Sequence, residues 1–501
     1  MVSPLRQTLE MDLHRDAAAP VYHQIADHIR RQVGAGGLVE GDRLPPIRQL
    51  AERLGVNRDT VSLAYEELAA EGIVEAHVGR GTFVRGQRSR APEPGAPAEA
   101  VLAPAVERLL DFERGRARYP TSDTAIPLHS LKPDPDLFPV EAFRRSVNRA
   151  FADGGAALLT YGGPQGHADL REVVASRLRT TGVNVGPESV VLCHGASQGI
   201  SLALRLFAGA GDTVAVEEPT YHNVLGTLIG LGLRPLPIPM RGDGPDLDAL
   251  DRALRRPEVK LFYTIPTFHN PMGISTSLAH RRELLAVAHR TGKPIIEDSY
   301  EMDLRFAGRP VPPLAGLDES GLVVQLVSFS KSLFPGVRAG AVVARGRPVD
   351  ALLAVKHATD LGGALPLQAA LAGFIRSGAY DRHLGTMRRK LRGRRDALLE
   401  GLVAAMPEGT RWTRPEGGYQ VWVELPEPLD SRELFDDAAH AGVLYAPGHQ
   451  FNHDGRPSRG LRLTFSQAGE EGLRLGAARL GQVARERLAS APAERSATVH
   501  M

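Results

Sequence analysis

The 501-residue sequence contains one cysteine, Cys193, and no long apolar run. A single thiol excludes an intrachain disulfide, which fits a reducing compartment. No stretch reaches the ~18 apolar residues that a membrane helix requires. The opening residues, MVSPLRQTLEMDLHRD, carry acidic groups and no apolar segment, unlike a signal peptide. We therefore expect a cytoplasmic protein that does not bind membranes.

Metal motifs and a basic excess are also missing. There is no Cys-x-x-Cys and no His-Glu-x-x-His, and the Gly and Asn around His449 and His453 favour a loop, so we expect no metal site. The net charge is +2, and residues 1–90 hold 12 Arg, no Lys and 12 acidic residues. Bulk charge therefore does not indicate a nucleic-acid partner, and such a function must depend on where individual arginines lie.

The size of the chain predicts two or three folded units. Its composition also changes along its length. Residues 1–85 are charged and helix-like. Residues 86–125, rich in Pro, Ala and Arg, indicate a linker, in which AVERLLDFERGRARYP can form a short helix or dock on another part of the chain. Residues 126–485 alternate short β-branched runs with helical segments, which predicts βα units around a mostly parallel sheet. Residues 486–501 form a small, polar tail.

The N-terminal part has the spacing of a helix-turn-helix. Apolar residues at 21, 25, 29 and 33 predict a first helix. In LPPIRQLAERLGVNRDTVSLAYEELAAEGIV, Ala51 is small where two helices cross, Gly55 suits a left-handed turn, and Val61 buries the next helix. Asn57 or Asp59 can cap that helix. The following VEAHVGRGTFV indicates a β-hairpin, or wing.

Five residues of this part are placed to contact DNA. The second helix of the pair begins near Arg58, so Arg58 and Thr60 would face the major groove. Arg80 lies at the glycine-flanked tip of the hairpin, where it could approach a groove or phosphate. Arg43 and Arg48 could contact backbone phosphates.

A small packing module of three helices could share this spacing. The whole segment from Pro20 to Val84, however, resembles the winged head of GntR-type bacterial regulators. The resemblance implies that this part binds DNA.

The strongest motif of the large part is SFSKSLFPGVRAG, at residues 328–340. It places an amine, Lys331, between serines after a β-branched strand, and an arginine, Arg338, seven residues later. An amine that condenses with an aldehyde, together with the Ser328 hydroxyl and a guanidinium for a phosphate, suits pyridoxal 5′-phosphate (PLP). A β-lactamase-like Ser-x-x-Lys is the alternative, but no SDN or KTG triplet accompanies it.

Further polar residues follow predicted strands. Asp298 ends the strand in IIEDSY, where open α/β sheets bind ligands, and a carboxylate there would keep the PLP ring nitrogen protonated. Tyr300 and Asn270 could donate to the ring's phenolic oxygen, and Tyr221 could stack on the ring. Arg462 lies in a later strand and could bind a substrate carboxylate.

The phosphate end of the site would use a helix N-terminus. In CHGASQGISL, Ala196 and Ser197 begin a helix whose free N–H groups could bind phosphate. Taken singly, each of these motifs also fits a cap, a turn, a core position or a solvated surface charge.

The order of the motifs over 126–485 resembles the fold-type I aminotransferases. The resemblance implies a mostly parallel central sheet with a smaller C-terminal α/β part, and PLP as cofactor. It also implies that Tyr161, in YGGPQGHADLR, reaches the phosphate of a partner subunit. The Asp-to-Tyr spacing of two matches the regulator branch, whereas Ala196 stands where a hydroxyl residue is frequent. The roles implied are those of the cofactor lysine, the ring-nitrogen carboxylate, the two phenolic-oxygen donors and the carboxylate-binding arginine: Lys331, Asp298, Asn270, Tyr300 and Arg462.

A winged head fused to a PLP domain resembles the MocR subgroup of GntR regulators. That resemblance implies a head-to-tail homodimer, an operator with two half-sites, and PLP or a PLP–amino compound adduct as effector. We expect a transcription regulator with little or no turnover. An active aminotransferase carrying a DNA-binding head, and a DNA-binding protein with an inactive large domain, are the rivals.

Overall fold

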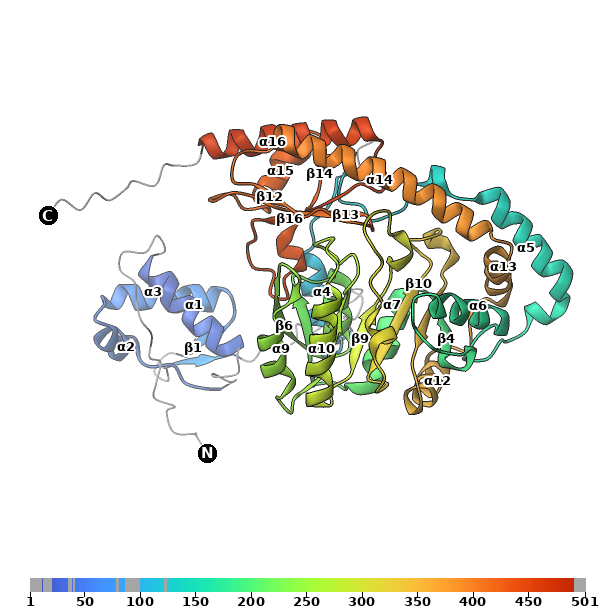
Figure 1. The fold of residues 1–501 in the computed structure, drawn as a ribbon. Coiled ribbons are helices and arrows are strands. Elements are labelled where there is room, and N and C mark those ends of the chain that lie inside the picture. The colour runs from blue at the N-terminus through green and yellow to red at the C-terminus, as the bar shows by residue number, and fades with distance from the viewer. Residues whose placement is uncertain are drawn as a thin grey trace. The chain divides into compact units, whose positions relative to one another are not determined.

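The computed structural model describes Met11, residues 20–34, Leu38, and residues 41–77, 81–85, 100–120 and 124–490. Backbone contacts divide the chain into two compact units, residues 1–101 and 102–501. Both units appear in Figure 1. In the described residues no helix is both long and apolar enough to cross a membrane.

The first unit is a winged helix-turn-helix, as the spacing predicted. Ala51 and Val61 are buried, and Gly55 adopts a left-handed φ of 64° between the two helices. Asn57, rather than Asp59, caps the second helix by accepting a hydrogen bond from the Asp59 N–H at 3.2 Å. The wing is an antiparallel strand pair. The elements are α1 (Val21–Gly34), α2 (Ile47–Leu54), α3 (Arg58–Ala70), β1 (Val74–His77) and β2 (Gly81–Val84).

The second unit is built on an eight-stranded sheet in the order β4-β11-β10-β9-β8-β5-β6-β7. Its central pairs are parallel, while β11 runs antiparallel to both neighbours and β7 to β6, which confirms the predicted mostly parallel sheet. The strands are β4 (Val190–Cys193), β5 (Thr213–Glu218), β6 (Arg234–Arg241), β7 (Gly244–Pro245), β8 (Val259–Thr264), β9 (Ile295–Asp298), β10 (Val323–Ser328) and β11 (Gly340–Val343).

Helices cover both faces of this sheet because its strands are apolar on both sides. In β4, Val190 and Leu192 belong to one buried cluster and Val191 and Cys193 to another, so alternate side chains feed two cores. One core takes in α6 (Ala168–Arg179), α9 (Leu247–Leu254), α10 (Leu278–Thr291) and α11 (Leu314–Leu317), and the other α7 (Ala196–Phe207), α8 (His222–Gly230) and α12 (Arg347–Thr359).

A smaller C-terminal part packs beside the large sheet. It holds a four-stranded sheet in the order β12-β13-β16-β15, and the long helices α14 and α16 run side by side over it (Figure 1). The bounds of these elements are α14 (Ala379–Ala405), β12 (Arg411–Trp412), β13 (Gln420–Glu424), β15 (Ala446–Pro447), β16 (Gly460–Thr464) and α16 (Glu470–Ser490).

Further elements of the second unit are α5 (Val140–Gly154), α13 (Leu365–Arg376), α15 (Leu434–His440) and the parallel pair β3 (Ile126–Pro127) with β14 (Val443–Leu444).

Part of the segment expected as linker is folded against the second unit. Helix α4 (Pro104–Arg114) packs on α8, and its Phe112 ring stacks on His222 with 4.4 Å between centroids. Leu109 and Phe112 fit against Gly226 and Gly230, where a Cβ would come within 3.4 Å of them. The large unit therefore begins near Leu102, earlier than the composition indicated.

Candidate functional site

A cavity of about 190 Å³ lies in the second unit, where residues following several strands and the start of α7 meet. Its lining includes nine of the residues that the sequence assigned to a cofactor, brought together from five separate segments. They are Ala196, Ser197, Tyr221, Asn270, Asp298, Tyr300, Ser328, Lys331 and Arg338.

Lys331 reaches this cavity from the loop after β10. Its Nζ donates to the carbonyl oxygen of Leu131 at 2.8 Å, and Tyr419 Oη donates to the Lys331 carbonyl at 2.6 Å. Burial lowers the pKa of Lys331 below that of an ordinary lysine, although the Glu301 carboxylate opposes the shift. A larger share of this amine is therefore neutral, and so nucleophilic, near pH 7.

Asp298 ends β9 and is 1% exposed. Tyr263 Oη donates to its Oδ2 at 2.7 Å, whereas its Oδ1 has no hydrogen-bond partner among the described residues. Burial raises the pKa of Asp298 to about 6, and the Tyr263 bond acts in the opposite direction. A buried carboxylate oxygen without a donor is costly, so this atom is suited to receive one from a ligand.

Asn270 and Arg462 form one unit beside the cavity. Arg462 is buried in β16, and its Nη1 donates to Asn270 Oδ1 at 2.8 Å, which leaves the Asn270 amide NH₂ as a donor. Arg462 Nη2 donates to the His129 carbonyl at 2.9 Å, while its buried Nε has no partner in the described part of the chain. The position assigned to a carboxylate-binding arginine thus lies next to the cavity, behind Asn270.

The opposite end of the cavity is shaped for a compact anion. Gly195 precedes α7 with a φ of 83°, and a Cβ there would lie 3.2 Å from Arg338 Nη2. Arg338 itself has a left-handed φ of 44° and donates to the His194 carbonyl at 2.6 Å. A guanidinium, the Ser328 hydroxyl and the start of α7 therefore line the same cavity, and together they suit a phosphate.

Tyr221 borders the cavity just before α8. Its Oη accepts a hydrogen bond from Asn223 Nδ2 at 2.9 Å, and Arg116, just after α4, donates to Asn223 Oδ1 at 2.6 Å. Burial, followed by the Asp298 charge, raises the pKa of Tyr221 to about 12. Asn223 thus joins Tyr221 to Arg116.

Three buried residues of the site escaped the sequence analysis: Tyr263, Glu301 and Gln420. Gln420 Nε2, from β13, lies 2.8 Å from Tyr300 Oη and 3.3 Å from Glu301 Oε2. Burial raises the pKa of Glu301, and its Oε1 has no partner within the described residues. Glu301 could have been predicted from its position directly after Tyr300. Gln420 could not, because it lies more than a hundred residues from Tyr300 in the chain.

Tyr161 does not join this cavity. Its side chain is 82% exposed. The prediction that it contacts a partner subunit's phosphate therefore stays a prediction.

The predicted DNA-contacting residues have a different setting. Arg43, Arg48 and Arg58 are exposed and Thr60 is half-buried, with Arg58 and Thr60 in the first turn of α3. The Arg43 guanidinium lies 6.0 Å from the Phe83 ring centroid, and Arg48 and Arg58 form no ion pair within the described residues. Arg80 lies outside the described residues.

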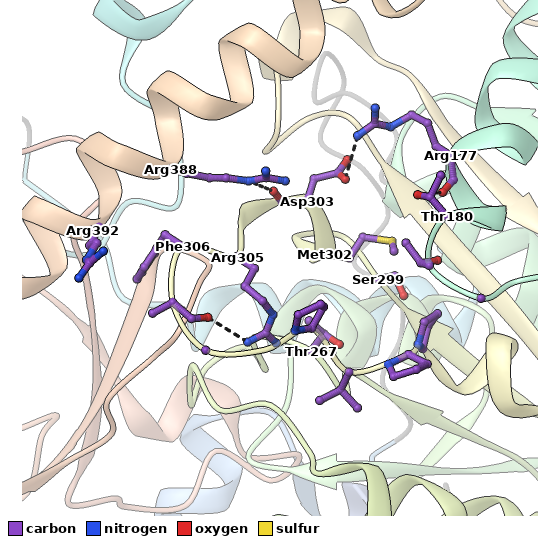
Figure 2. Close-up of a pocket in the computed structure, with 18 of the residues that line it drawn as sticks. Arg177, Thr180, Thr267, Ser299, Met302, Asp303, Arg305, Phe306, Arg388 and Arg392 are labelled. Atoms are coloured by element: carbon purple, nitrogen blue, oxygen red, sulfur yellow. Dashed lines mark hydrogen bonds and ion pairs between the residues drawn. The ribbon is translucent and has the colours of Figure 1, made fainter.

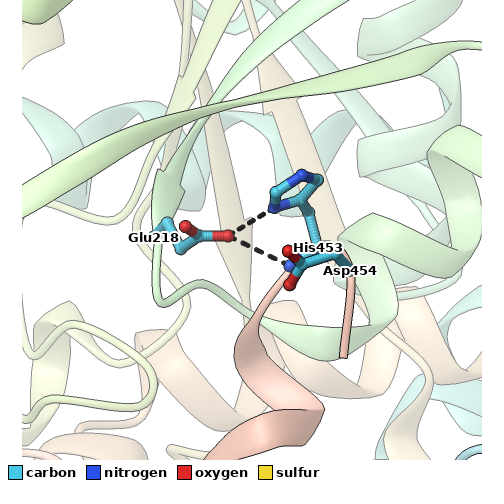
Figure 3. A group of neighbouring side chains, drawn as sticks. All are labelled: Glu218, His453 and Asp454. Atoms are coloured by element: carbon cyan, nitrogen blue, oxygen red, sulfur yellow. Dashed lines mark hydrogen bonds and ion pairs between the residues drawn. The ribbon is translucent and has the colours of Figure 1, made fainter. Parts of the chain in front are cut away.

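A histidine and two carboxylates meet at the end of β5 (Figure 3). His453 Nδ1 lies 2.5 Å from Glu218 Oε1, and Asp454 is adjacent. Arg456 pairs with the other Glu218 oxygen, so a cation already compensates this carboxylate. The arrangement ties the loop around His453 to β5.

Comparison with known proteins identifies both units. Residues 132–480 match the family of class I and II aminotransferases, and residues 21–84 match the gntR family of bacterial regulatory proteins. The chain belongs to the GntR-type regulators that carry an aminotransferase-like unit.

Two regulators match nearly the whole chain, and a solved aminotransferase matches most of it. The chain is 31% identical over 460 residues to the probable rhizopine catabolism regulatory protein MocR of Rhizobium meliloti, covering 91% of this chain and 92% of that protein. It is 30% identical over 468 residues to the HTH-type transcriptional regulator YdcR of Escherichia coli (strain K12), covering 93% and 99%. The crystal structure of the α-aminoadipate aminotransferase LysN of Thermus thermophilus, complexed with N-(5′-phosphopyridoxyl)-L-leucine, aligns with a TM-score of 0.69 at 31% identity, covering 78% of this chain and 96% of that one.

The cavity of this GntR-type regulator fits the cofactor that its fold implies, PLP. The unpartnered Asp298 Oδ1 suits a protonated ring nitrogen, and the Asn270 amide suits a phenolic oxygen. The point where Arg338 and the start of α7 meet suits a phosphate, and Lys331 supplies the amine. When bound, PLP supplies an aldehyde for amines and a ring that withdraws electrons.

Proposed function

We propose that this protein is a transcription regulator that binds DNA through its winged head and senses PLP, or PLP joined to an amino compound, in its large unit. The observation that carries the proposal is a single chain with both a head that exposes Arg43, Arg48 and Arg58 and a cavity lined by residues suited to a cofactor. A protein that only bound DNA would not need the cavity, and an enzyme would not need the head.

In this function the residues hold and sense a ligand. Asp298 would keep the ring nitrogen protonated, Asn270 and Tyr300 would bind the phenolic oxygen, and Arg338 the phosphate. Lys331 would compete with an effector amine for the aldehyde carbon. Displacing the lysine side chain would remove its Nζ from the Leu131 carbonyl.

We further propose that the protein acts in the cytoplasm as a head-to-tail homodimer on an operator with two half-sites. The exposed Tyr161 supports this assembly, because an 82% exposed tyrosine beside a glycine-rich turn is available to a second subunit. A dimer would place the half-sites in register with the duplex repeat.

The deciding experiment measures operator affinity of the wild type and Lys331→Ala, with and without PLP and candidate amines. Lys390→Ala, which removes an exposed lysine of α14, is the matched control. We expect PLP and amines to change the affinity or footprint of the wild type and of the control, but not of Lys331→Ala. The proposal would be contradicted if neither PLP nor the amines changed the operator affinity, the footprint or the promoter output of the wild type.

An active aminotransferase is the second candidate. The buried Arg462 beside Asn270 favours it, because a guanidinium there can bind an amino acid's carboxylate. Steady-state amino transfer by the purified protein, lost in Lys331→Ala, would establish this activity, and its absence would leave the regulatory function.

A further inference from the structure

A second cavity, of about 870 Å³, opens between α14 and the loop that follows β9 (Figure 2). Its size is that of a small-molecule site. Five arginines line it and only one carboxylate among the described residues does, that of Asp303. The arginines are Arg177, Arg305, Arg388, Arg389 and Arg392.

The positive charge of this cavity is only partly compensated. Asp303 Oδ1 already pairs with Arg177 Nη2 at 3.2 Å, and Arg305 pairs with Glu416. Arg388 uses its Nε to bind the Asp303 carbonyl at 2.8 Å, which leaves its two terminal nitrogens as donors. Arg392, one helical turn further along α14, makes no hydrogen bond or ion pair with the described residues.

Like charges four residues apart on a helix repel each other. Arg388 and Arg392 nevertheless both line this cavity from α14; in Figure 2 Arg388 reaches toward Asp303, and Arg392 lies near Phe306. The loop after β9 adds apolar side chains, Met302, Phe306 and Pro312, beside the ion-paired Arg305. Two guanidinium groups with free donors, together with these apolar side chains, suit a ligand with a doubly charged head and a short organic body.

The cavity is connected to the cofactor site through direct contacts. Tyr380 Oη lies 2.8 Å from Asp303 Oδ2 and 2.7 Å from Ser332 Oγ, and Ser332 follows Lys331 in the chain. Ser332 and Tyr380 are fully buried, so no solvent surrounds them. A movement of the Asp303 side chain would therefore move Tyr380 and Ser332 as well.

We propose that this cavity is a second effector site, which binds a small organic anion, either a phosphate monoester or a dicarboxylate, and is coupled to PLP binding through Asp303 and Tyr380. The proposal goes beyond the DNA function and does not depend on it. Coupling between two sites is reciprocal, so the anion and PLP should change each other's affinity by the same factor.

The test uses the full-length protein loaded with PLP, so that the cofactor's own phosphate site is filled. Calorimetric titrations with inorganic phosphate, glycerol phosphate and succinate at constant ionic strength compare the wild type with Arg388→Ala/Arg392→Ala. The control is Arg382→Ala/Lys390→Ala, which removes two charges from the same helix outside the cavity. We expect saturable binding to wild type and control, weakened about ten-fold or more by the cavity pair.

Whichever organic anion binds more tightly identifies the head group, and its presence should also shift PLP affinity. Arg392→Ala alone, at an exposed position, serves if the double variant does not fold. The proposal would be overturned by any of three results. The wild type shows no saturable anion binding, both double variants lose the same affinity, or the affinity for PLP is the same with and without the anion. Loss of affinity for random duplex DNA without any small-anion binding would instead assign these arginines to a nucleic-acid backbone.

Discussion

The head and the large unit place their functional groups in opposite environments. In the head, Arg48 and Arg58 are exposed and lie outside the apolar cluster that stabilises the three helices. In the large unit, Asp298 and Arg462 are buried and bonded to other residues of the site. Function and stability should therefore separate easily in the head and hardly at all in the cofactor site.

The difference follows from the ligands. A DNA backbone is met at the surface, and its phosphates need charges that remain solvated until contact. A cofactor held in an enclosed cavity is bound by groups that have already lost their water, so each must be satisfied by neighbours or by the ligand.

The largest expected effect is at Lys331. Lys331→Ala should abolish covalent attachment of PLP, because the described lining of the cavity contains no other lysine. Borohydride reduction followed by peptide mass spectrometry measures it, with Lys390→Ala as the control. A reduced cofactor on a different lysine would contradict the assignment.

The next effect tests whether the two units are independent. Leu68, in α3, is fully buried, and Leu68→Ala should destabilise the head by about 2–5 kcal/mol. DNA affinity should fall while PLP absorbance stays unchanged, since each unit is compact by itself and has its own buried core. Leu63→Ala, at a 49% exposed site on the same helix, should change neither. Loss of PLP binding in Leu68→Ala would show that the head also stabilises the cofactor site.

A smaller effect is expected at Arg58. Arg58→Ala should weaken specific DNA binding by about 1–3 kcal/mol if a base contact is lost, without changing the thermal midpoint of the head. Arg48→Ala should instead weaken binding evenly across sequences, as a phosphate contact would. Fluorescence anisotropy on operator and random duplexes distinguishes the two. Unchanged affinity for both variants would mean that another surface reads DNA.

The smallest effect concerns proton affinity in the cavity. The Glu301 charge raises the pKa of Lys331 against burial, so Glu301→Gln should lower that pKa further. Acetylation of Lys331 in the cofactor-free protein, followed over pH, should then reach half its maximal rate at a lower pH than in the wild type. An unchanged midpoint would mean that Glu301 is protonated and carries no charge to act on Lys331.

Much of the cofactor site was predictable because its residues follow strands or begin a helix. Parallel strands end at one edge of a sheet, so Asp298 and Asn270 meet although 28 positions separate them. Tyr263 and Gln420 were missed because each contributes through a partner distant in sequence, and no local pattern indicates such a pair. Within the segment predicted as a linker, the composition allowed a short helix or a docked segment, but the packing of α4 on α8 depends on residues more than a hundred positions away.

The docking of α4 shortens the tether between the two units. If residues 86–125 all formed the connection, it could span up to about 140 Å, since an extended chain covers at most ~3.3–3.6 Å per residue. Because the large unit begins near Leu102 and the wing ends at Val84, the connection can span only about 60 Å. At ~3.4 Å per base pair, a head can reach no more than about 18 base pairs from its α4 anchor. In the homodimer proposed above, the distance between the two half-sites would thus be limited by the position at which this helix packs.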